Sequence, residues 1–573
     1  MKASDYIAEF LFRQGVTCVF EVVGGMITHL IDSLSRSGKT KIVSMHHEQA
    51  AAFAAGGYAR LSGVPGVALA TSGPGAINLL TGVGCCYYDS HPAVFFTGQV
   101  NRDEMKGTRD VRQLGFQETD IVSMARPITK GAFLVNDPAE LPGVLNKAFQ
   151  LALEGRPGPV LVDIPMDVQR MEVPDNFPRP ASAAVVQPDI KPWIDQLQED
   201  LSRALRPIIL AGGGIRSGRA QKEFLKWAEK TGIPVVTSLP GVDVIPFSHP
   251  QRVGMIGSYG NRWANLALGK ADLVLVMGSR LDIRQTGSEV NSFKEGKEIW
   301  HFDCQSGEIN NRIKGCKPVL GHLKGVLQAL SQVAGWRAHG NLPSWKMEIE
   351  SLRQAWPDTR ELEGIPGINP NVFLHALSRF SHGGRGYFVD VGQNQMWAGQ
   401  SVEIQAGQRF QTSAGMGSMG FALPAAIGAA FSEPGKPIVV IAGDGGFQMN
   451  VQELQTIVQH KLPIKMVILN NKSLGMVRQF QESYFDGRVQ STLWGYSTPD
   501  FAKVAGAYGI PGRSLHATEE IDTCLESLWE NPAAPFLLEV EISDKASALP
   551  KIAFGKPITE MEPFSKPLDM EGT

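Results

Sequence analysis

The sequence has few cysteines, no long apolar run and almost no excess charge. Its six cysteines among 573 residues form neither a CxxC pair nor a zinc-binding spacing, which excludes a disulfide framework and predicts reduced thiols in a cytoplasmic protein. No apolar run reaches the ~18 residues of a membrane span, and the first residues lack the apolar stretch of a signal peptide. A formal net charge of -3 argues against a dedicated nucleic-acid binder.

Short apolar segments instead alternate regularly with helical patterns. Many of the 62 glycines stand at the ends of these segments, where tight turns need a missing Cβ. Several segments lack the alternation of half-exposed strands, as buried parallel strands do. This alternation of apolar segments and helical patterns predicts an α/β protein made of doubly wound parallel sheets. The clearest strand segments are GVTCVFEV, TKIVSMH, PGVALATSG, PAVFFTGQV, PVLVDIP, RPIILAGGG, IPVVTSL, ADLVLVMGSR, GYFVDVG, PIVVIAGDGG and IKMVILNN.

Two connecting segments divide the chain into three predicted domains. Residues 170–192 are rich in Pro and Ala, have no periodicity and predict a linker. Residues 336–368 are polar, contain several Trp and predict a second crossing segment. We therefore expect domains at 1–170, 190–335 and 365–545, each near the ~150 residues of an ordinary domain. The tail 546–573 contains four prolines and predicts an extended arm.

Two strand ends of the third domain carry the residue types of a metal and diphosphate site. The strand KPIVVIA runs into the motif GDGG at 443–446, a helical pattern follows, and the strand PIKMVIL runs into NN at 470–471. Both turns of such a βαβ unit lie at the carboxyl edge of a parallel sheet, where ligands bind. Asp444, Asn471 and a backbone carbonyl near Ser473 offer the oxygen ligands that Mg²⁺ prefers. The glycines expected to let backbone N–H groups approach a phosphate, at a helix start whose dipole favours anions, are Gly443, Gly445 and Gly446.

Two ordinary turns would also explain these motifs, because GDG is common between strands and helices. The spacing is more specific, since Asn471 follows Asp444 by 27 positions across one strand–helix–strand unit. That pattern resembles the signature of thiamine-diphosphate enzymes, and the segments MNVQELQTIVQ and NNKSLGMVRQ resemble their acetolactate synthase branch. The resemblance covers nearly the whole chain and implies pyrimidine-binding, central and diphosphate-binding domains in that order.

Glu48 is the candidate for proton transfer. It follows the strand TKIVSM and opens an Ala-rich helix, a position where a helix dipole alone would favour a glutamate. The segment HEQAAAFAAGGYAR resembles the one that carries the family's catalytic glutamate. The resemblance implies that Glu48 promotes formation of the cofactor carbanion, while His46 and His47 are interpreted as structural.

Further segments resemble those that hold thiamine diphosphate in this family. TSAGMGSMGFALPAAIGAAF implies that the Gly417 carbonyl and the Met419 N–H bind the pyrimidine, although a Gly-rich turn before an apolar helix would look the same. The family usually has His at position 394. The resemblance also assigns catalytic or cofactor contacts to Gly25, Phe116, Gln117, Val391, Gly392, Gln393, Asn394 and Met476, with a backbone turn at 71–76.

The middle domain resembles the flavin-binding domain of acetolactate synthases. A glycine cluster after the strand RPIILA is weak evidence for a nucleotide by itself. The resemblance implies FAD without a net redox role, whereas related decarboxylases hold ADP there and others hold nothing. A family Asp appears here as His322. The implied flavin contacts are Arg156, Gly212, Gly213, Gly214, Thr237, Ser238, Leu239, 257–260, Arg280, Leu281, Asp282, Ile283, Arg284, Glu308 and Ile309.

The substrate positions depart from acetolactate synthase. Phe480 stands where the family has Trp, which changes the pocket volume and removes an N–H donor. Met166 replaces a channel Lys, and Val23 lies in a changed YPGGA motif, whereas Arg284 is kept. The segment FEVVGGMITHLID resembles a subgroup that adds an acetyl branch to nucleotide-linked keto-sugars, as in yersiniose biosynthesis.

These features predict a carboligase that decarboxylates pyruvate and joins the two-carbon unit to another ketone. Ordinary acetolactate synthase is the first alternative, and a carbon–carbon hydrolase or 2-keto acid decarboxylase is the second. A cofactor-binding protein without catalysis is disfavoured, since Glu48, Asp444 and Asn471 are all present. The resemblance implies a homodimer or homotetramer with active sites at subunit interfaces, and the expected partners are small molecules, not membranes or nucleic acids.

Overall fold

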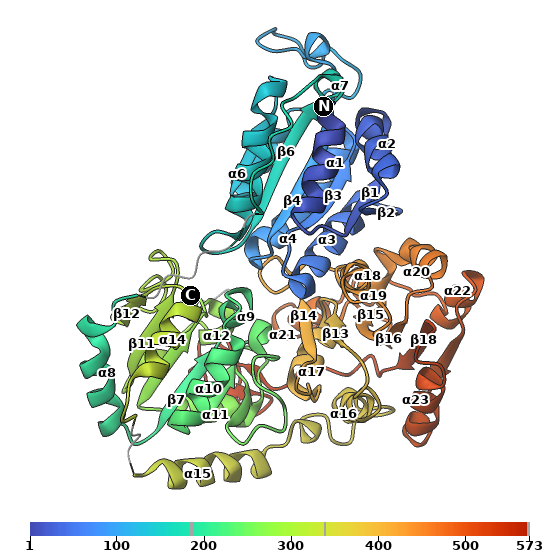
Figure 1. Cartoon of the computed structure of the whole chain (residues 1–573). Helices are drawn as coiled ribbons and strands as arrows, with labels where there is room; N and C mark the ends of the chain where they lie inside the picture. The colour runs from blue at the N-terminus through green and yellow to red at the C-terminus, as the bar shows by residue number, and fades with distance from the viewer. Residues whose placement is uncertain (181, 183–187, 337–339, 570–573) are drawn as a thin grey trace.

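The computed structural model describes residues 1–180, 182, 188–336 and 340–569, which form three six-stranded sheets (Figure 1). Every strand pairing within these sheets is parallel. Buried apolar clusters and helices cover both faces of each sheet. The prediction of an α/β protein with three doubly wound parallel sheets is therefore confirmed.

The first sheet has the order β2-β1-β3-β4-β6-β5. Its strands are β1 (Cys18–Val22), β2 (Lys41–Ser44), β3 (Gly66–Ala70), β4 (Ala93–Gln99), β5 (Gly131–Leu134) and β6 (Pro159–Pro165). One face packs on α1 (Ala3–Arg13), α2 (Thr28–Ser37) and α6 (Leu141–Leu153). The other face packs on α3 (Glu48–Ser62), α4 (Pro74–Tyr88) and α5 (Ile121–Ala125).

The second sheet has the order β12-β11-β10-β7-β8-β9, which is the order of dinucleotide-binding folds. Its strands are β7 (Pro207–Ala211), β8 (Val235–Thr237), β9 (Arg252–Met255), β10 (Leu273–Met277), β11 (Glu298–Asp303) and β12 (Lys317–Leu320). One face packs on α8 (Lys191–Arg203), α10 (Gln221–Thr231) and α14 (Leu323–Gln332). The other packs on α11 (Arg262–Lys270) and α15 (Leu342–Ala355).

The third sheet, β14-β13-β15-β16-β18-β17, repeats the order of the first. Its strands are β13 (Gly386–Val389), β14 (Arg409–Thr412), β15 (Ile438–Gly443), β16 (Ile464–Asn470), β17 (Gly512–Leu515) and β18 (Phe536–Glu541). One face packs on α16 (Pro370–Phe380), α17 (Gln393–Ser401) and α23 (Ile521–Trp529). The other packs on α18 (Ala422–Ser432), α20 (Leu454–His460) and α22 (Phe501–Ala507).

Helices α3 and α18 join the first and third domains, and one apolar cluster contains residues of both (Figure 1). Two glycines let the helix backbones approach closely. A Cβ at Gly57 would lie 2.0 Å from the Ala425 carbonyl oxygen, and a Cβ at Gly428 would lie 1.8 Å from that of Ala54. The contact therefore depends on glycine at both positions.

The predicted linker at 170–192 and crossing segment at 336–368 include residues 181, 183–187 and 337–339, which lie outside the described residues. The second segment also contains a helix, α15, that its polar composition did not predict. Trp345 of this helix is buried, and its indole N–H donates to the Pro207 carbonyl at 3.0 Å. One apolar side of α15 is therefore packed on the central sheet.

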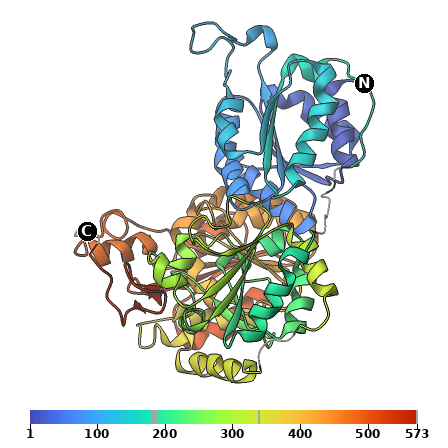
Figure 2. The same cartoon turned by 90° about the vertical axis from the view of Figure 1, so that its left-hand side faces the viewer.

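The tail is packed against the central domain instead of extending freely. It forms a two-stranded antiparallel sheet, β19 (Lys551–Ile552) and β20 (Met561–Glu562). Ile552, Ile558 and Met561 are buried in the cluster that covers one face of the second sheet. Figure 2 shows the C-terminal end beside the lower domains, away from the first sheet. Residues 570–573 of the predicted arm lie outside the described residues.

Candidate active site

The metal and diphosphate motifs lie where the third sheet reverses its strand order, between β13 and β15. Doubly wound sheets bind ligands outside the carboxyl ends of their strands at this point. Residues 391–394 follow β13, residues 443–446 overlap the end of β15, and Asn471 follows β16. Segments that are far apart in the sequence thus meet at one edge of the sheet.

Asp444 and Asn471 are neighbours at this edge, because β15 and β16 pair with Gly443 opposite Leu469. Asn471 Oδ1 accepts the backbone N–H of Ser473 at 3.2 Å. Asp444 Oδ2 accepts the hydroxyl of Tyr496 at 3.2 Å. All three proposed ligand residues are buried.

The carboxylate of Asp444 has no cationic partner among the described residues. Its side chain is 3% exposed, and burial raises its pKa to about 6. A bound Mg²⁺ would offset this cost, and one carboxylate with amide and carbonyl oxygens is a suitable set for an ion shared with a phosphate. The residues therefore fit magnesium. The described residues contain no cluster of three or more His, Cys, Asp or Glu side chains that could hold another kind of metal.

The helix predicted after Asp444 is interrupted. Helix α19 (Asp444–Gln448) has five residues, and a 3-10 turn at Val451–Glu453 separates it from α20. A helix of five residues has a small dipole. It therefore adds little to the binding of a phosphate that was predicted at this helix start. Packing alone requires a glycine at position 446, because a Cβ there would lie 2.3 Å from Asp390 Oδ1.

Asp390 holds the segment predicted to seat the pyrimidine, and the sequence patterns did not single it out. It is buried directly after β13 and accepts the backbone N–H groups of Gly420 at 2.9 Å and Ala422 at 2.8 Å. Burial raises its pKa to about 6. Gly417 has a positive φ of 67°, as a tight turn requires. The Met419 methyl lies beside Gly445, 3.2 Å from the position of an added Cβ.

Asn394 is turned toward its own backbone instead of an open phosphate site. Its amide group donates to the Asp390 carbonyl at 2.7 Å, and its Oδ1 faces Gly392 and Gly443. The family's His at this position is therefore replaced by a side chain that braces the strand end.

The first domain gathers a second group of predicted residues around Glu48. This half-buried side chain begins α3, and Asn78 of α4 donates to its Oε2 at 2.9 Å. The nearest backbone is the 71–76 turn, where a Cβ at Gly75 would lie 3.1 Å from Glu48 Oε1. Gln117 contacts the same turn at Gly73 and has a positive φ of 66°, a strained backbone of the kind that clusters at functional sites.

This group and the metal site are not joined within one chain. Among the described residues, no hydrogen bond or ion pair links Glu48 or Gln117 to the proposed metal ligands. The residues beside Glu48 contact the third domain elsewhere: His46 N–H donates to Glu453 at 2.9 Å, and Asn450 donates to Gln49 at 3.3 Å. The Glu48 group and the proposed metal ligands therefore make no direct contact of this kind, although α3 packs on the third domain.

The predicted substrate residues are also dispersed over three domains. Val23 is 63% exposed and Phe116 is 80% exposed, which is unusual for large apolar side chains. Phe480 belongs to α21 (Gly475–Tyr484) and packs on Tyr484 in a tilted arrangement, with ring centroids 4.8 Å apart. Met166 begins the short helix α7 (Met166–Arg170), and Gly25 has open space around it.

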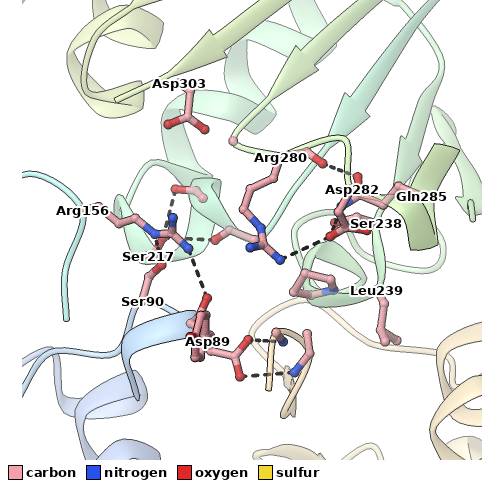
Figure 3. Close-up of a pocket in the computed structure, with 18 of the residues that line it drawn as sticks. Asp89, Ser90, Arg156, Ser217, Ser238, Leu239, Arg280, Asp282, Gln285 and Asp303 are labelled. Carbon is pink, nitrogen blue, oxygen red and sulfur yellow. Dashed lines mark hydrogen bonds and ion pairs between the residues drawn. The ribbon is translucent and has the colours of Figure 1, made fainter. Parts of the chain in front are cut away.

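A cavity opens between the three domains, with a space of about 1300 Å³ that includes its mouth (Figure 3). Arg280 reaches toward its middle, and Arg156 lies on one wall (Figure 3). Arg156 donates to Ser90, the Tyr88 carbonyl and Glu308, so it mainly braces this wall.

Most predicted flavin residues line this cavity, but some do not. The lining includes Arg156, Gly213, Gly214, Ser238, Leu239, Ser258, Tyr259, Arg280, Asp282, Arg284 and His322. Gly212, Thr237, Glu308 and Ile309 are outside the lining. A Cβ at Gly212 would lie 2.1 Å from the Gly278 carbonyl oxygen, so this glycine serves strand packing. Asp303, at the end of β11, lines the cavity instead, and its position directly after a strand was the signal available in the sequence.

Asp89, which also lines the cavity, connects it with the pyrimidine segment. It ends α4, and its carboxylate accepts the backbone N–H of Gly415 at 2.8 Å and that of Ala414 at 3.2 Å (Figure 3). Burial raises its pKa, while Arg60 lowers it. The first domain thereby holds the third-domain loop that leads to Gly417.

The fold and site define the chain as a member of the thiamine pyrophosphate enzymes. Residues 1–124 match the N-terminal TPP binding domain of that family, 194–330 the central domain and 390–540 the C-terminal TPP binding domain.

Relatives with similar sequences include several acetolactate synthases. The chain is 37% identical over 568 residues to acetolactate synthase 3, chloroplastic, of Brassica napus, covering 97% of this chain and 85% of the relative. It is 35% identical over 575 residues to the acetolactate synthase isozyme 2 large subunit of Escherichia coli K12, covering 98% and 99%. It is 36% identical over 561 residues to the acetolactate synthase large subunit of Lactococcus lactis, covering 97% and 95%. The chain thus belongs to the thiamine pyrophosphate enzyme family and is similar to acetolactate synthase large subunits.

Proposed function

We propose that this chain decarboxylates pyruvate and transfers the two-carbon acetyl-anion equivalent to a ketone other than pyruvate, giving a tertiary alcohol. The observation that carries the proposal is the presence of the proton-transfer and metal-ligand residues together with altered substrate positions. Glu48, Asp444 and Asn471 are present, whereas Phe480 and Met166 replace the Trp and Lys expected for acetolactate synthase.

Each cofactor residue has a separate task in this proposal. Bound thiamine diphosphate supplies the nucleophilic carbon and accepts the electrons released when carbon dioxide leaves. Asp444, Asn471 and the Ser473 carbonyl hold Mg²⁺ and so anchor the diphosphate. The Gly417 carbonyl and Met419 N–H orient the pyrimidine, and Glu48 holds a proton at its ring nitrogen. Asn78 keeps the Glu48 carboxylate in place through its 2.9 Å hydrogen bond.

The acceptor pocket is proposed to take a bulky ketone, such as a nucleotide-linked keto-sugar. Val23 and Phe480 present exposed apolar surfaces, and Met166 presents a neutral side chain. These side chains favour an acceptor with less negative charge at the reacting end than pyruvate has. Arg284 is exposed and lines the central cavity, so its guanidinium is available to an acceptor that enters from that side.

Biosynthetic acetolactate synthase is the second candidate. The similarity to acetolactate synthases over almost the entire chain favours it. The two candidates share the donor half of the reaction and differ in the acceptor alone. The acceptor residues therefore decide between them.

The central cavity is proposed to hold FAD. Arg280 offers a positive charge to a diphosphate, and Asp303 offers an acceptor for ribose hydroxyls at the end of β11. The strand order of the second sheet is that of dinucleotide-binding folds, which supports this assignment. The absorbance spectrum of the purified protein tests it directly.

The active enzyme is proposed to be a homodimer or homotetramer in the cytoplasm. The Glu48 group and the proposed metal ligands share no hydrogen bond or ion pair among the described residues, and the resemblance to thiamine-diphosphate enzymes supports a site that a second copy of the chain completes. The exposed Phe116 and Val23 are apolar surfaces that such contact would cover. No helix among the described residues is long and apolar enough to cross a membrane.

The test is incubation with pyruvate and a panel of ketones, diketones and nucleotide keto-sugars, with products identified by mass spectrometry. A mixed product from pyruvate and an added ketone is expected. Acetolactate at a rate unchanged by every added ketone would favour the second candidate, and free acetaldehyde as the main product would indicate a decarboxylase.

A further inference from the structure

The amide of Asn471 can bind a metal through Oδ1 alone, so its orientation has to be fixed. Asn471 Nδ2 donates to Gln393 Oε1 at 2.8 Å, which turns Oδ1 toward the metal site. Gly475 keeps this pair close, since a Cβ there would lie 1.9 Å from Gln393 Oε1. The orientation of Asn471 therefore depends on which atom Gln393 presents.

Gln393 is in turn oriented by Gln479 of α21. Gln393 Nε2 donates to Gln479 Oε1 at 3.2 Å. Both side chains are buried, so neither amide has water as an easy alternative. If Gln479 offered no acceptor, a reversed Gln393 would face Asn471 with an N–H group instead of an oxygen.

Gln479 is fixed by the beginning of the C-terminal tail. Its Oε1 also accepts the backbone N–H of Ala548 at 3.0 Å, and its Nε2 donates to the Ala548 carbonyl at 3.2 Å. The backbone N–H and carbonyl of Ala548 cannot exchange places, so this double contact allows one orientation of the Gln479 amide. The hydrogen bonds then run in one sense from Ala548 through both glutamines to Asn471.

We propose that Gln479 is a positioning residue for the metal site, and that the C-terminal tail, through Ala548, sets the orientation of Asn471. This inference rests on the proposed Mg²⁺ site at Asp444 and Asn471. Residues behind metal ligands usually change affinity about 10–100-fold when they are lost. The tail thus has a second role besides packing on the central domain.

The experiment measures Mn²⁺ binding to the full-length protein with saturating thiamine diphosphate, from the electron paramagnetic resonance signal of free Mn²⁺. Gln479→Leu is expected to raise the dissociation constant about 10–100-fold. Gln479→Glu keeps the acceptor for Gln393 and the Ala548 N–H, and its second oxygen can donate to the Ala548 carbonyl when protonated, so at pH 5 it is expected to bind within about threefold of wild type. Thermal unfolding of each variant reports stability separately.

Gln400→Leu is the matched control. Gln400 is buried and donates to the carbonyl of Leu549 at 3.0 Å, so it holds the same part of the tail. It has no hydrogen bond to Gln393 or Asn471 among the described residues. Its loss should loosen the tail and leave Mn²⁺ affinity within about threefold of wild type.

The outcomes separate this inference from the proposed function. If the wild-type protein binds no Mn²⁺, the proposed metal site is wrong, and this inference falls with it. If wild type binds and Gln479→Leu binds equally well, the positioning role is wrong and the metal site stands. Equal losses in Gln479→Leu and Gln400→Leu would also overturn it, because general tail packing would then explain both. Should Gln479→Leu fail to fold, Gln479→Met, which is apolar and of similar length, must show the same loss.

Discussion

Replacing Asp444 by Asn should stabilise the protein when metal and cofactor are absent, although it removes a proposed metal ligand. The side chain is 3% exposed, and burial raises its pKa from the ordinary value of 3.8 to about 6. A carboxylate in this position is costly unless a cation binds it. Asn keeps the shape and an oxygen for Tyr496 but carries no charge.

The magnitude follows from the pKa. A rise from 3.8 to about 6 corresponds to about 3 kcal/mol well above pH 6, since one pKa unit is 1.36 kcal/mol. Because the folded-state pKa is raised, protonation favours the folded state. This contribution is complete below pH 3.8 and is lost as the pH rises through about 6. An unpaired amide N–H costs about 1 kcal/mol, so the net gain at pH 8 should be about 2 kcal/mol.

The assay is urea unfolding of metal-free and cofactor-free protein, followed by tryptophan fluorescence. The advantage of Asp444→Asn should fall from about 2 kcal/mol at pH 8 to under 1 kcal/mol at pH 5, where wild-type Asp444 is mostly protonated when folded. Mg²⁺–thiamine diphosphate, treated as one ligand at 100 times its wild-type dissociation constant, should add about 2.7 kcal/mol to wild type and almost nothing to a variant that has lost the metal ligand. The order of stability should therefore reverse on loading.

Asp486→Asn is the control, because this aspartate is 87% exposed and its substitution should matter little at either pH. A variant at Asp444 that is less stable than wild type without metal at pH 8 would refute the reasoning. An advantage of the same size at pH 8 and pH 5 would refute it as well, since the gain would not come from the ionised carboxylate.

Three further changes test the other parts of the site. Glu48→Gln should lower turnover about 10²–10⁴-fold, as expected for loss of a proton-transfer group, and full activity would contradict this role. The affinity for thiamine diphosphate, measured by calorimetry, should stay nearly unchanged. Asp303→Asn should lower the FAD affinity, measured by absorbance titration, about tenfold because a charged acceptor is lost, whereas Thr237→Val lies outside the cavity lining and should leave it unchanged. The reverse result would indicate that Thr237, and not Asp303, contacts the flavin. Phe480→Trp should shift the product ratio toward acetolactate about tenfold in competition between pyruvate and another ketone, and an unchanged ratio would remove Phe480 from the acceptor pocket.

The sequence predicted those features that depend on neighbours along the chain. Asp444 and Asn471 each follow a buried strand, and parallel pairing brings such strand ends together. The alternation of strands and helices was sufficient for the three sheets. Glycine at strand ends marked the turns, as at Gly278, which directly follows β10 and has a positive φ of 64°.

Features that depend on distant partners were missed. Asp390 stands directly before a recognised motif, but its role is visible only where it meets Gly420 and Ala422 some 30 positions later. The resemblance assigned Glu308 to the flavin site, whereas Asp303, the last residue of β11, is the one that lines the cavity. The tail looked extended because its prolines exclude helix, while its packing partners lie nearly 300 residues earlier.

Three buried carboxylates on the strands or directly after them have different internal donors. Asp390 accepts three backbone N–H groups, including that of Val391 at 2.9 Å, and burial still raises its pKa to about 6. Asp163 accepts from Thr97 and Gln99, and burial raises its pKa to about 7. Asp444 accepts the Tyr496 hydroxyl at 3.2 Å, and the backbone N–H groups of Gly445 and Ser473 also lower its pKa, which burial nevertheless raises to about 6. Asp444 differs from the other two in its position beside Asn471 at the switch point of the third sheet, where a bound cation would offset the cost of its burial.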